Sequence, residues 1–482
     1  MMQVVDAPVQ AGLLAYGAYL PRHRLQRSEL ATALGTGTGG GHGARIVASC
    51  DEDSTTLGVA AARRALARGG SPDSIYFATT APAYFDKTNA TAIHAALDLG
   101  HRGFAVDLAG AARGGSGALR AAATTGGLAV LADIRTGRPG SADERDGGDG
   151  AAAFLFGGGE DGAKPIAHVV AQASATAEFL DRWRKPGESA SSTWEDRFGL
   201  ESYLPLVKDA AGRVLERAAI EQADHVVVSC SQARAVAAGA KLFQSRIAAT
   251  PPAIGYVGAA DLGLGLAAVL DRAGPDETIL LIGAADGCDA FVLRTTTELT
   301  RRRAARPLEA QLAEGRDLLY STFLTWRGEL EREAPRRPEP DRPAAPPSAR
   351  SEAWKFGFVG TRCAVCGRVH VPPNRVCSGC HAVDQMERAP LANKAGTVAT
   401  YTVDRLAFSP SPPMIDAVID FDGGGRCTLE LTDAKPDEVE IGTRVEMTFR
   451  RLYTSGGVHN YFWKARPYEA MPEAEQLHQP RR

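Results

Sequence analysis

The sequence lacks long apolar runs, a net charge of either sign and a leader-like start, and each absence removes a class of function. No apolar stretch approaches the ~20 residues that a membrane-spanning helix needs. The first residues, MMQVVDAPVQ, have neither a basic start nor an apolar core, so they do not form a secretory signal. Lys and Arg total 54 against 57 Asp and Glu, a net charge of -3 that offers nucleic acid no basic surface. We therefore expect no membrane and no nucleic-acid partner.

Cysteine is also scarce, with eight residues in a chain of 482. Four of the eight stand in paired spacing, which is typical of metal binding in a reducing compartment, so we expect a cytoplasmic protein. Hydrophobic residues make up 44% and charged residues 23%, as in ordinary globular proteins. At this length we expect two or three domains.

The first domain is organised around residues 103–120, GFAVDLAGAARGGSGALR. This stretch predicts a short buried strand with Phe104, Val106 and Leu108, a turn of small residues, and a helix that begins near Gly114. Several enzyme folds place a nucleophile at such an elbow, because the helix N-terminus stabilises negative charge beside it. Here residues 110–113 are Gly, Ala, Ala and Arg, so the elbow holds no nucleophile.

Strands and helices alternate along the first 330 residues. The expected strands are 12–20, 74–79, 127–133, 151–156, 164–172, 224–228, 278–282 and 290–293. The expected helices are 53–68, 89–99, one from 114, one from 229–231 to 243, 261–272 and 317–330. LAD…GGDGAAAFLF and LLIGAADGCDAFVL repeat one pattern of strand, acidic turn and strand. We predict an α/β domain of two similar halves, about 1–165 and 166–330, with a ligand site where they meet.

A formal G-x-G-x-x-G match lies in residues 35–43, GTGTGGGHG. No strand leads directly into it and no clear apolar helix follows. We therefore predict a flexible loop there and no nucleotide site.

Six prolines between residues 333 and 350 mark a domain boundary, and we expect residues 331–352 to form a semi-rigid linker. Two C-x-x-C pairs follow, with ten residues between them: Cys363, Cys366, Cys377 and Cys380. Four thiolates close a tetrahedral zinc site, so we predict one structural zinc ion in a ribbon at 353–390, in preference to a redox dithiol or disulfides. Alternating strands at 391–472 indicate a small β-barrel of OB type, and 473–482 a tail.

Several segments of the first 330 residues carry a family resemblance: GLLAYGAYLPRHRL, CDEDSTTLGVAAARRAL, YFATTAPAYFDKTNATAIHAALDL, the elbow, and LADIRTGRPGSADERDGGDGAAAFLFG. They resemble the thiolase superfamily, in the branch of 3-hydroxy-3-methylglutaryl-CoA synthase and ketoacyl-ACP synthase III. From residue 354 onward the chain resembles the zinc-ribbon plus OB-fold family (domain of unknown function 35), whose members accompany thiolase-like enzymes. The implied fold is a duplicated, layered α-β-α-β-α domain followed by a ribbon and a barrel.

The family resemblance implies chemistry on CoA thioesters by an elbow cysteine, a histidine, and an asparagine or glutamate. On the family pattern these positions fall on Ala112 for the cysteine, Ser229 for the histidine, Ala259 for the asparagine and Thr80 for the glutamate. An alanine forms no acyl-enzyme, so transfer through Ala112 is excluded. Backbone amides of the elbow remain available to hold a thioester oxygen.

Three hypotheses follow for function. The first is an enzyme of lipid metabolism that makes or breaks carbon–carbon bonds on CoA thioesters without an acyl-cysteine. The second is a catalytically inactive scaffold that works with an active partner thiolase, and the third is a pure acyl-CoA-binding module. We expect acyl-CoA as substrate or ligand and a homodimer formed through the thiolase-like domain.

The candidate catalytic residues for the first hypothesis are Tyr84, Asp86, Lys87, His94 and Cys230. Each has a structural alternative. Asp86 and Lys87 fit a solvated loop pair, and His94 fits a satisfied core histidine. Cys230 fits a small buried hydrophobe, although a place at a helix start would depress its pKa. Arg138, Arg145 and Trp183 are candidate contacts to the CoA nucleotide, with ordinary surface roles as the alternative.

Overall fold

The computed structural model describes residues 11–35, 42–158, 163–194, 196–243, 246–247, 253–333, 335 and 337–468. Most of the expected glycine loop (36–41) and the whole expected tail (473–482) lie outside these residues. The chain divides into two units, Met1–Arg332 and Glu333–Arg482. Within the described residues, no helix has both the length and the apolar composition to cross a membrane.

The first unit is built on a ten-stranded sheet that contains the same topology twice. The first half uses β1 (Gly12–Tyr19), β4 (Ser74–Thr79), β5 (Phe104–Ala109), β6 (Gly127–Asp133) and β7 (Gly150–Gly157). The second uses β8 (Ala167–Ala175), β11 (His225–Cys230), β12 (Arg246–Ile247), β13 (Thr278–Ala284) and β14 (Cys288–Thr295). Counted from the centre of the sheet outward, each half places its first strand along the chain innermost, followed by its fifth, fourth, second and third strands. The two halves meet where Leu13 of β1 pairs with Ala167 of β8.

The strand directions also repeat, which confirms the predicted duplication. In the first half β1–β7 and β6–β7 are antiparallel, whereas β4–β6 and β4–β5 are parallel. In the second half β8–β14 and β13–β14 are antiparallel, whereas β11–β13 and β11–β12 are parallel.

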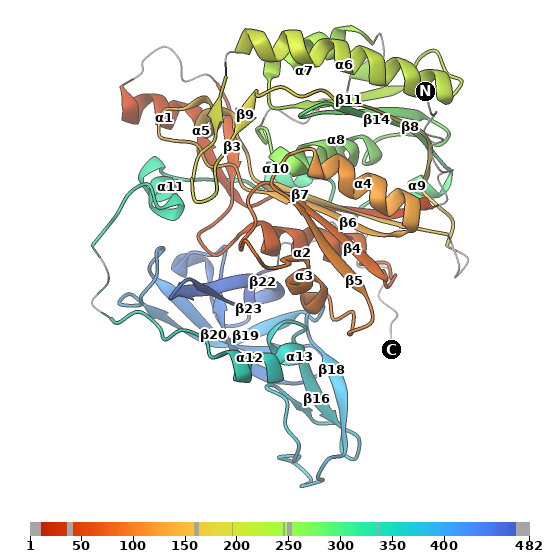
Figure 1. The fold of residues 1–482 in the computed structure, drawn as a ribbon. Coiled ribbons are helices and arrows are strands. Elements are labelled where there is room, and N and C mark those ends of the chain that lie inside the picture. Colours follow the sequence, from red (N-terminus) through yellow and green to blue (C-terminus); the bar gives the residue numbers. More distant parts are fainter. Residues whose placement is uncertain are drawn as a thin grey trace. The chain divides into compact units, whose positions relative to one another are not determined.

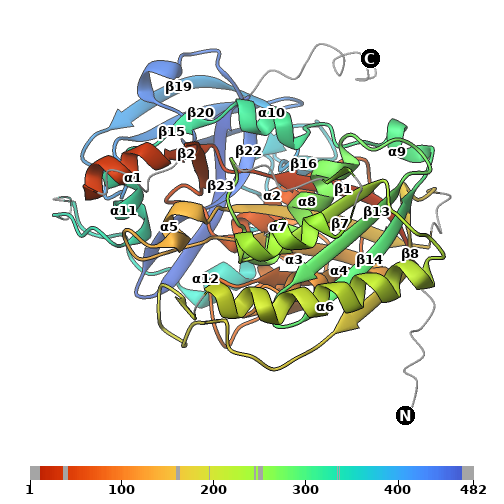
Figure 2. The same cartoon turned by 90° about the horizontal axis from the view of Figure 1, so that it is seen from above.

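The helices form layers on and between the two halves of the sheet (Figure 1). In Figures 1 and 2, α6 (Asp196–Arg217) and α7 (Ala233–Lys241) cover one outer face, and α2 (Ser54–Ala65) and α3 (Ala90–Ala96) the other. Between the halves lie α4 (Gly114–Thr125) and α8 (Asp261–Leu270), and all ten residues of α8 are buried. Leucines and alanines of these two helices join both sheet faces in one core, which gives the predicted α-β-α-β-α layering.

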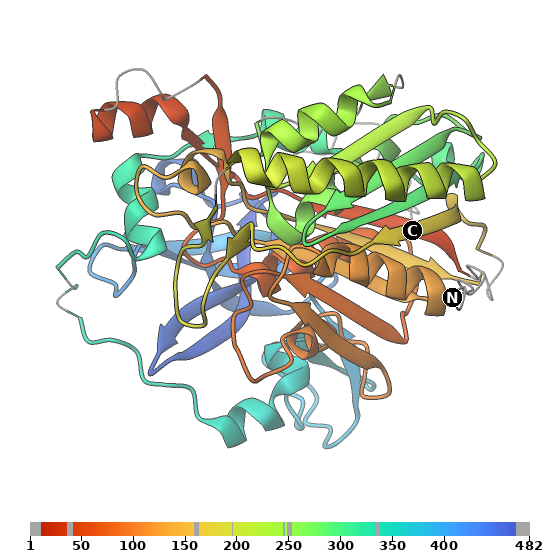
Figure 3. The same ribbon diagram turned by 45° about the horizontal axis from the view of Figure 1, so that its top comes forward.

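The remaining elements of the first unit surround this core (Figure 3). They are β2 (His23–Gln26), α1 (Arg27–Leu34), β3 (Ala44–Val47), α5 (Ala142–Asp146), β9 (Arg182–Trp183), β10 (Ser192–Thr193), η1 (Gly258–Ala260), α9 (Glu298–Arg301), α10 (Leu308–Ala313), β15 (Arg316–Asp317) and α11 (Tyr320–Arg327).

Three sequence-based expectations need correction. The strand β5 is not buried but is the edge of the sheet, and Phe104 on it is 57% exposed. Residues 229 and 230 belong to β11, so the following helix begins only at Ala233. The last expected helix of this unit is shorter than 317–330, because Arg316–Asp317 pairs with β2 as a strand before α11 begins at Tyr320.

The second unit contains a zinc-ribbon fold and a barrel. Within the expected semi-rigid linker, residues 345–350 form the helix α12 (Ala345–Arg350), which is followed by α13 (Glu352–Lys355). The ribbon is a small sheet of β16 (Val359–Cys363), β17 (Val369–His370) and β18 (Met386–Pro390). The barrel closes in the order β19-β20-β21-β23-β22, from β19 (Gly396–Asp404), β20 (Met414–Phe421), β21 (Arg426–Leu431), β22 (Arg444–Ser455) and β23 (Val458–Pro467), with η2 (Pro436–Glu438) between β21 and β22.

Candidate functional site

A cavity of about 540 Å³ lies at the elbow between β5 and α4. Its walls come from both halves of the first unit: Thr80 and Ala112 from the first half, and Ser231, Tyr256 and Asp286 from the second. Among the described residues that line it there is no cysteine, histidine or asparagine. The cavity therefore lies where duplication predicts a ligand site, but it offers no nucleophile of the family type.

Glycines let the elbow approach its neighbours closely. Gly110 has a φ of 108°, in the region that favours glycine, and its N–H donates to the Thr79 carbonyl at 2.9 Å. A Cβ on Gly115 would lie 2.2 Å from the carbonyl oxygen of Ala259, so only glycine allows α4 to meet the turn before α8 at this distance. The elbow, Thr80 and Ala259 are thereby held together.

The buried Asp133 carboxylate binds two of the positions that the resemblance singled out. It accepts hydrogen bonds from the Thr80 hydroxyl at 2.8 Å and from the Ala259 N–H at 2.8 Å. Burial raises its pKa, and the nearby Arg135 guanidinium acts in the opposite direction. Asp133 thus fixes the shape of the site from beneath and does not line the cavity.

Ser229 is the third of these positions, and it is buried at the end of β11. Its hydroxyl is hydrogen-bonded to Asp261 at the start of α8. Burial raises the pKa of Asp261 to about 6, although this hydrogen bond and one from the Val257 N–H at 3.1 Å lower it. Neither group lines the cavity.

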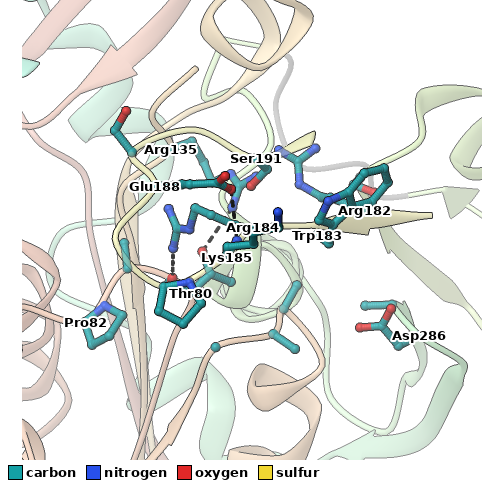
Figure 4. A pocket seen from close by; sticks show the side chains of 18 of the residues that line it. Thr80, Pro82, Arg135, Arg182, Trp183, Arg184, Lys185, Glu188, Ser191 and Asp286 are labelled. Carbon is teal, nitrogen blue, oxygen red and sulfur yellow. Dashed lines mark hydrogen bonds between the residues drawn. The ribbon is translucent and has the colours of Figure 1, made fainter. Parts of the chain in front are cut away.

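Cationic side chains crowd one wall of the cavity (Figure 4). Arg135, only 5% exposed, donates to the Thr80 hydroxyl at 3.0 Å, and its guanidinium lies 5.7 Å from the centre of the Tyr256 ring. Arg184 donates to the Thr80 carbonyl, and Lys185 follows it on the same wall. Arg182 is paired with Asp143. Burial lowers the pKa of Arg184, and the neighbouring Arg135 lowers it further.

An acidic group that the sequence reasoning missed lies across the cavity from Thr80 in Figure 4. Asp286, in the turn between β13 and β14, adopts a φ of 50°, which is uncommon for a residue with a side chain. Partial desolvation at the cavity raises its pKa, and the carboxylates of Asp181 and Glu178 add to the effect, whereas Arg113 opposes it. The acidic turn GAADGCD could have indicated this carboxyl group in the sequence. The sequence pattern of strand, acidic turn and strand was interpreted only as evidence for a duplicated fold.

Arg113, the last residue of the elbow, ties the Asp286 turn to α4. Its guanidinium donates to the Asp286 carbonyl at 2.8 Å and forms an ion pair with Asp289 at 2.9 Å. Tyr203 supports the same turn, since its hydroxyl accepts from the Asp286 N–H at 3.4 Å and donates to Asp181 at 3.3 Å.

The five predicted catalytic residues do not lie together in the structure. None of them is among the described residues that line the cavity. Tyr84, Asp86 and Lys87 lie in the loop before α3, where Asp86 is exposed and Lys87 donates to Thr91 at 3.0 Å. Phe85, between them, does line the cavity.

His94 and Cys230 lie elsewhere. His94 is on α3, and its ring is so close to Gly103 that a Cβ there would lie 2.6 Å from Nε2. Cys230 ends β11 and does not start a helix, so burial raises the pKa of its thiol to about 12 where a helix start was expected to depress it.

The three candidate CoA contacts also separate. Trp183 lines the cavity. Arg138 is exposed and does not line the cavity, and Arg145 is paired with Asp146.

The four ribbon cysteines do converge. Their sulfur atoms all lie within 4.8 Å of one another, with Cys363–Cys380 at 3.5 Å and Cys366–Cys377 at 3.4 Å. Sulfurs at the corners of a zinc tetrahedron with ~2.3 Å bonds lie about 3.8 Å apart, so the four thiols fit one zinc ion. With four protein ligands this would be a closed, structural site.

Comparison with known proteins agrees with this division of the chain. Residues 357–387 match the family model of the ChsH2 rubredoxin-like zinc ribbon domain, and residues 390–450 match that of the ChsH2 C-terminal OB-fold domain. A "DUF35 domain-containing scaffold protein" of Methanocaldococcus jannaschii is 36% identical over 120 residues, which are 24% of this chain and 84% of that protein.

The first unit has relatives of another kind. The hydroxymethylglutaryl-CoA synthase of Archaeoglobus fulgidus is 33% identical over 310 residues, which are 59% of this chain and 89% of the relative. A solved structure of MvaS in complex with 3-hydroxy-3-methylglutaryl coenzyme A shares the fold, with a TM-score of 0.57 at 18% identity over 79% of this chain and 99% of that one. An HMG-CoA synthase structure complexed with CoA gives 0.56 at 16% identity, over 65% and 89%. The chain therefore belongs to the hydroxymethylglutaryl-CoA synthase family of the thiolase fold, with a zinc ribbon and an OB-fold barrel of the ChsH2 type joined to it.

Proposed function

We propose that the first unit binds CoA thioesters in the elbow cavity and makes or breaks the carbon–carbon bond beside the thioester without a covalent acyl-enzyme. The single observation that carries the proposal is that Ala112 and the Asp286 carboxyl line one cavity. The first rules out an acyl-enzyme at the family's cysteine position, and the second provides an acid–base group for a reaction without one. Relatives named for hydroxymethylglutaryl-CoA synthesis and a neighbour complexed with CoA support the ligand class.

In the cleavage direction the substrate is a 3-hydroxyacyl-CoA. The Asp286 carboxylate takes the proton of the 3-hydroxyl, the C2–C3 bond breaks, and its electron pair moves onto the thioester as an enolate. A proton returned to C2 then gives a shortened acyl-CoA, and the other product is an aldehyde or ketone. No oxidant or reductant is needed, and the reverse sequence forms the bond.

The elbow suits the enolate that this reaction produces. Ala112 lies at the N-terminus of α4, whose twelve residues present the positive end of the helix dipole toward the cavity. Negative charge that develops on the thioester oxygen would be stabilised there.

A panel of 3-hydroxyacyl-, 3-oxoacyl- and acyl-CoA substrates tests the proposal. The purified, zinc-loaded chain should convert one class, and mass spectrometry should detect new thioesters without an acyl adduct on the protein. Asp286→Asn should lower turnover about 100-fold or more and keep binding. The matched control is Asp276→Asn, because Asp276 is also an exposed, left-handed aspartate in a turn beside β13 but lies outside the cavity lining.

Tight binding without turnover would favour the second candidate, a scaffold that presents acyl-CoA to an active partner. One observation supports this candidate specifically, namely the similarity of the second unit to a protein described as a scaffold. In that case activity should appear only when a partner thiolase is added.

We propose a second copy of the chain as the first unit's structural partner. β5 leaves one edge of the sheet open, and the exposed Phe104 lies on it. Sedimentation of the intact chain and of Phe104→Glu would show a dimer that the charge weakens.

A further inference from the structure

The Pro-rich stretch at the start of the second unit is a sequence motif that the proposed function does not use. Pro338 and Pro340 fix their own φ angles. Each also favours an extended backbone at the residue before it, here Arg337 and Glu339. Residues 338–344 accordingly form neither helix nor strand. A chain that prolines already hold extended loses little conformational entropy when it binds a surface, so this stretch is suited to be a peptide ligand.

The barrel groove, a cavity of about 430 Å³ on the outer face of the barrel, borders this stretch. Met414 and Asp416 of β20 line the groove, and they alternate along the strand with residues buried inside the barrel. Glu430 of β21 and Phe408 of the loop between β19 and β20 line it as well. OB folds bind their ligands on the face of the second and third strands, beside the loop that joins the first two. The prolines, which also line the groove, therefore lie on the face that OB folds use for ligands.

Two polar contacts join the stretch to the barrel, one on each side of the prolines in the sequence. The Arg337 guanidinium forms an ion pair with Asp404, at the end of β19, at 3.0 Å. The Tyr453 hydroxyl of β22 donates to the Asp341 carbonyl at 3.2 Å. The ion pair is partly exposed and contributes little by itself, so the stretch needs further contacts to stay on the barrel.

Aromatic rings provide these further contacts. Phe408, Tyr453 and Phe462, all partly buried, line the groove together with Pro338 and Pro340. Grooves lined by aromatic rings are the usual receptors for extended, proline-rich peptides. The barrel groove thus combines the rings that receive prolines with a carboxylate that pairs with an arginine.

The charge of the groove also suits an arginine. Among the described residues that line it, three carboxylates stand against one cation, Arg337. Glu430 is paired with Lys464 at 3.1 Å, outside the lining. Partial burial raises the pKa of the Asp416 carboxyl, Asp404 raises it further, and Lys464 lowers it. Two neighbouring carboxylates, Asp404 and Asp416, therefore favour a cationic peptide over a ligand that carries phosphate.

We propose that the barrel groove is a binding site for an extended peptide with an arginine next to spaced prolines, and that residues 337–341 of the same chain are its occupant. The stretch is then a strap that closes the ligand face of the barrel, and not a passive spacer. Any other ligand of this face has to displace the strap. The inference does not depend on the function proposed for the first unit, because every contact that carries it lies within the second unit.

Proteolysis of the Pro340–Asp341 bond in the full chain tests the strap. A protease that cuts before aspartate needs this bond released from the barrel, so the rate of cleavage reports how often the strap opens. Tyr453→Phe should accelerate cleavage about 5-fold, the size of one hydrogen bond, and Asp404→Asn about 2-fold, as for an exposed ion pair. Both substitutions lie in the barrel, so they leave the sequence around the cleaved bond unchanged.

The matched controls are Tyr401→Phe on β19 and Asp420→Asn on β20, which lie outside the groove lining and should leave the rate unchanged. Circular dichroism melting shows whether the four variants are equally folded. Cleavage of Tyr453→Phe and Asp404→Asn at the rate of the controls would overturn the proposal. A rate that rises when the unsubstituted chain is diluted would show that the groove holds the segment of a second copy, and the assignment to the same chain would be wrong.

Binding of a free peptide tests the recognition itself. The full chain with Pro338→Ser and Pro340→Ser should release its strap. It should then bind a fluorescent peptide of residues 335–343, PRRPEPDRP, at least about 10-fold more tightly than the unsubstituted chain does, because the tethered competitor has left the groove. The same peptide with Arg337→Glu should lose this affinity. Equal binding of the peptide to the two chains would contradict the proposal.

Discussion

The Arg113 guanidinium meets the Asp289 carboxylate along one edge, with Nε 2.9 Å from Oδ2 and Nη2 3.2 Å from Oδ1. The pair joins the elbow of the first half to β14 of the second, across 176 residues of sequence. The same guanidinium donates to the Asp286 carbonyl. The position of the proposed acid–base group therefore depends on the residue that follows the absent nucleophile.

Replacement of Arg113 by Gln should lower kcat about 10- to 100-fold and change KM little, because it releases the Asp286 turn and leaves the cationic wall of the cavity unchanged. Steady-state kinetics on the substrate found in the panel measures the split. Arg120→Gln, two turns farther along α4, is the control. An unchanged kcat in Arg113→Gln would show that the turn needs no clamp.

Activity in the cleavage direction should rise with pH through the pKa of Asp286. The carboxyl must lose its proton before it can act as a base, and the structure raises its pKa above the usual aspartate value. A pH profile of kcat should show this acidic limb. In Asp286→Asn the residual rate, reduced about 100-fold or more, should have lost the limb. A limb that persists in the variant would assign the titration to another group.

Restoring a thiol at the elbow should not restore family chemistry. In Ala112→Cys the described residues around the new thiol in the cavity include no histidine or asparagine, since Ser229 and Ala259 occupy those positions on the family pattern. Catalytic groups of this kind act as a unit, so we expect a gain of less than about 10-fold in turnover. Intact-protein mass spectrometry after incubation with acetyl-CoA measures the acyl-enzyme. Rapid and complete acylation of the introduced thiol would mean that another residue serves as its base.

The strand–helix pattern of the first unit could be predicted because its strands are apolar and its helices carry small residues at helical spacing. β4 and β6 have the bounds that the sequence predicted, and α2 lies within the predicted range 53–68, with Asp53 as its cap, accepting from the Thr56 N–H. The exposure of β5 could not be predicted, since apolar Phe104, Val106 and Leu108 look the same at a sheet edge as at its centre.

The site was predicted less well than the fold. The four ribbon cysteines could be predicted from their spacing, because the ligands of this metal site come from two short C-x-x-C pairs. The elbow cavity depends on contacts between segments far apart in the chain, such as Arg135 with Thr80 and Arg113 with Asp289. Candidates chosen by nearness in sequence to Thr80 and Ser229 therefore missed Asp286 and the cationic side chains that line the cavity.

Stability should fall as the pH rises from about 4 to about 6, through Asp261. Its native pKa is about 6, against about 3.9 in an unfolded chain, so in this window the native state binds a proton that the unfolded state has released. The full effect is roughly 3 kcal/mol. Urea unfolding at about pH 4.5 and about pH 7 should show about 2 kcal/mol of this loss in the unsubstituted chain relative to Asp261→Asn. Parallel curves for the two chains would contradict the assignment.

Loss of one ribbon cysteine should release the metal and unfold the ribbon. Cys377→Ser leaves three thiolates, so zinc content should fall from about one equivalent to near zero, with a lower melting temperature for the second unit. Cys427→Ser, in β21 and outside the cluster, should retain zinc. Atomic emission and calorimetry measure the two effects. Zinc retained in Cys377→Ser would show that the ribbon holds it through other ligands.

The repeated strand order also has a consequence for biosynthesis. The elbow leaves the ribosome with the first half, but its partner Asp289 follows 176 residues later. At about 5–20 residues per second, the nascent chain carries an unfinished, solvent-filled elbow for roughly ten seconds or more. Throughout that interval Arg113 lacks the Asp289 carboxylate, and for most of it α4 lacks α8. A chain released just before Asp289 would contain every residue that lines the elbow cavity, but it would lack β14, the strand that joins β13 to β8.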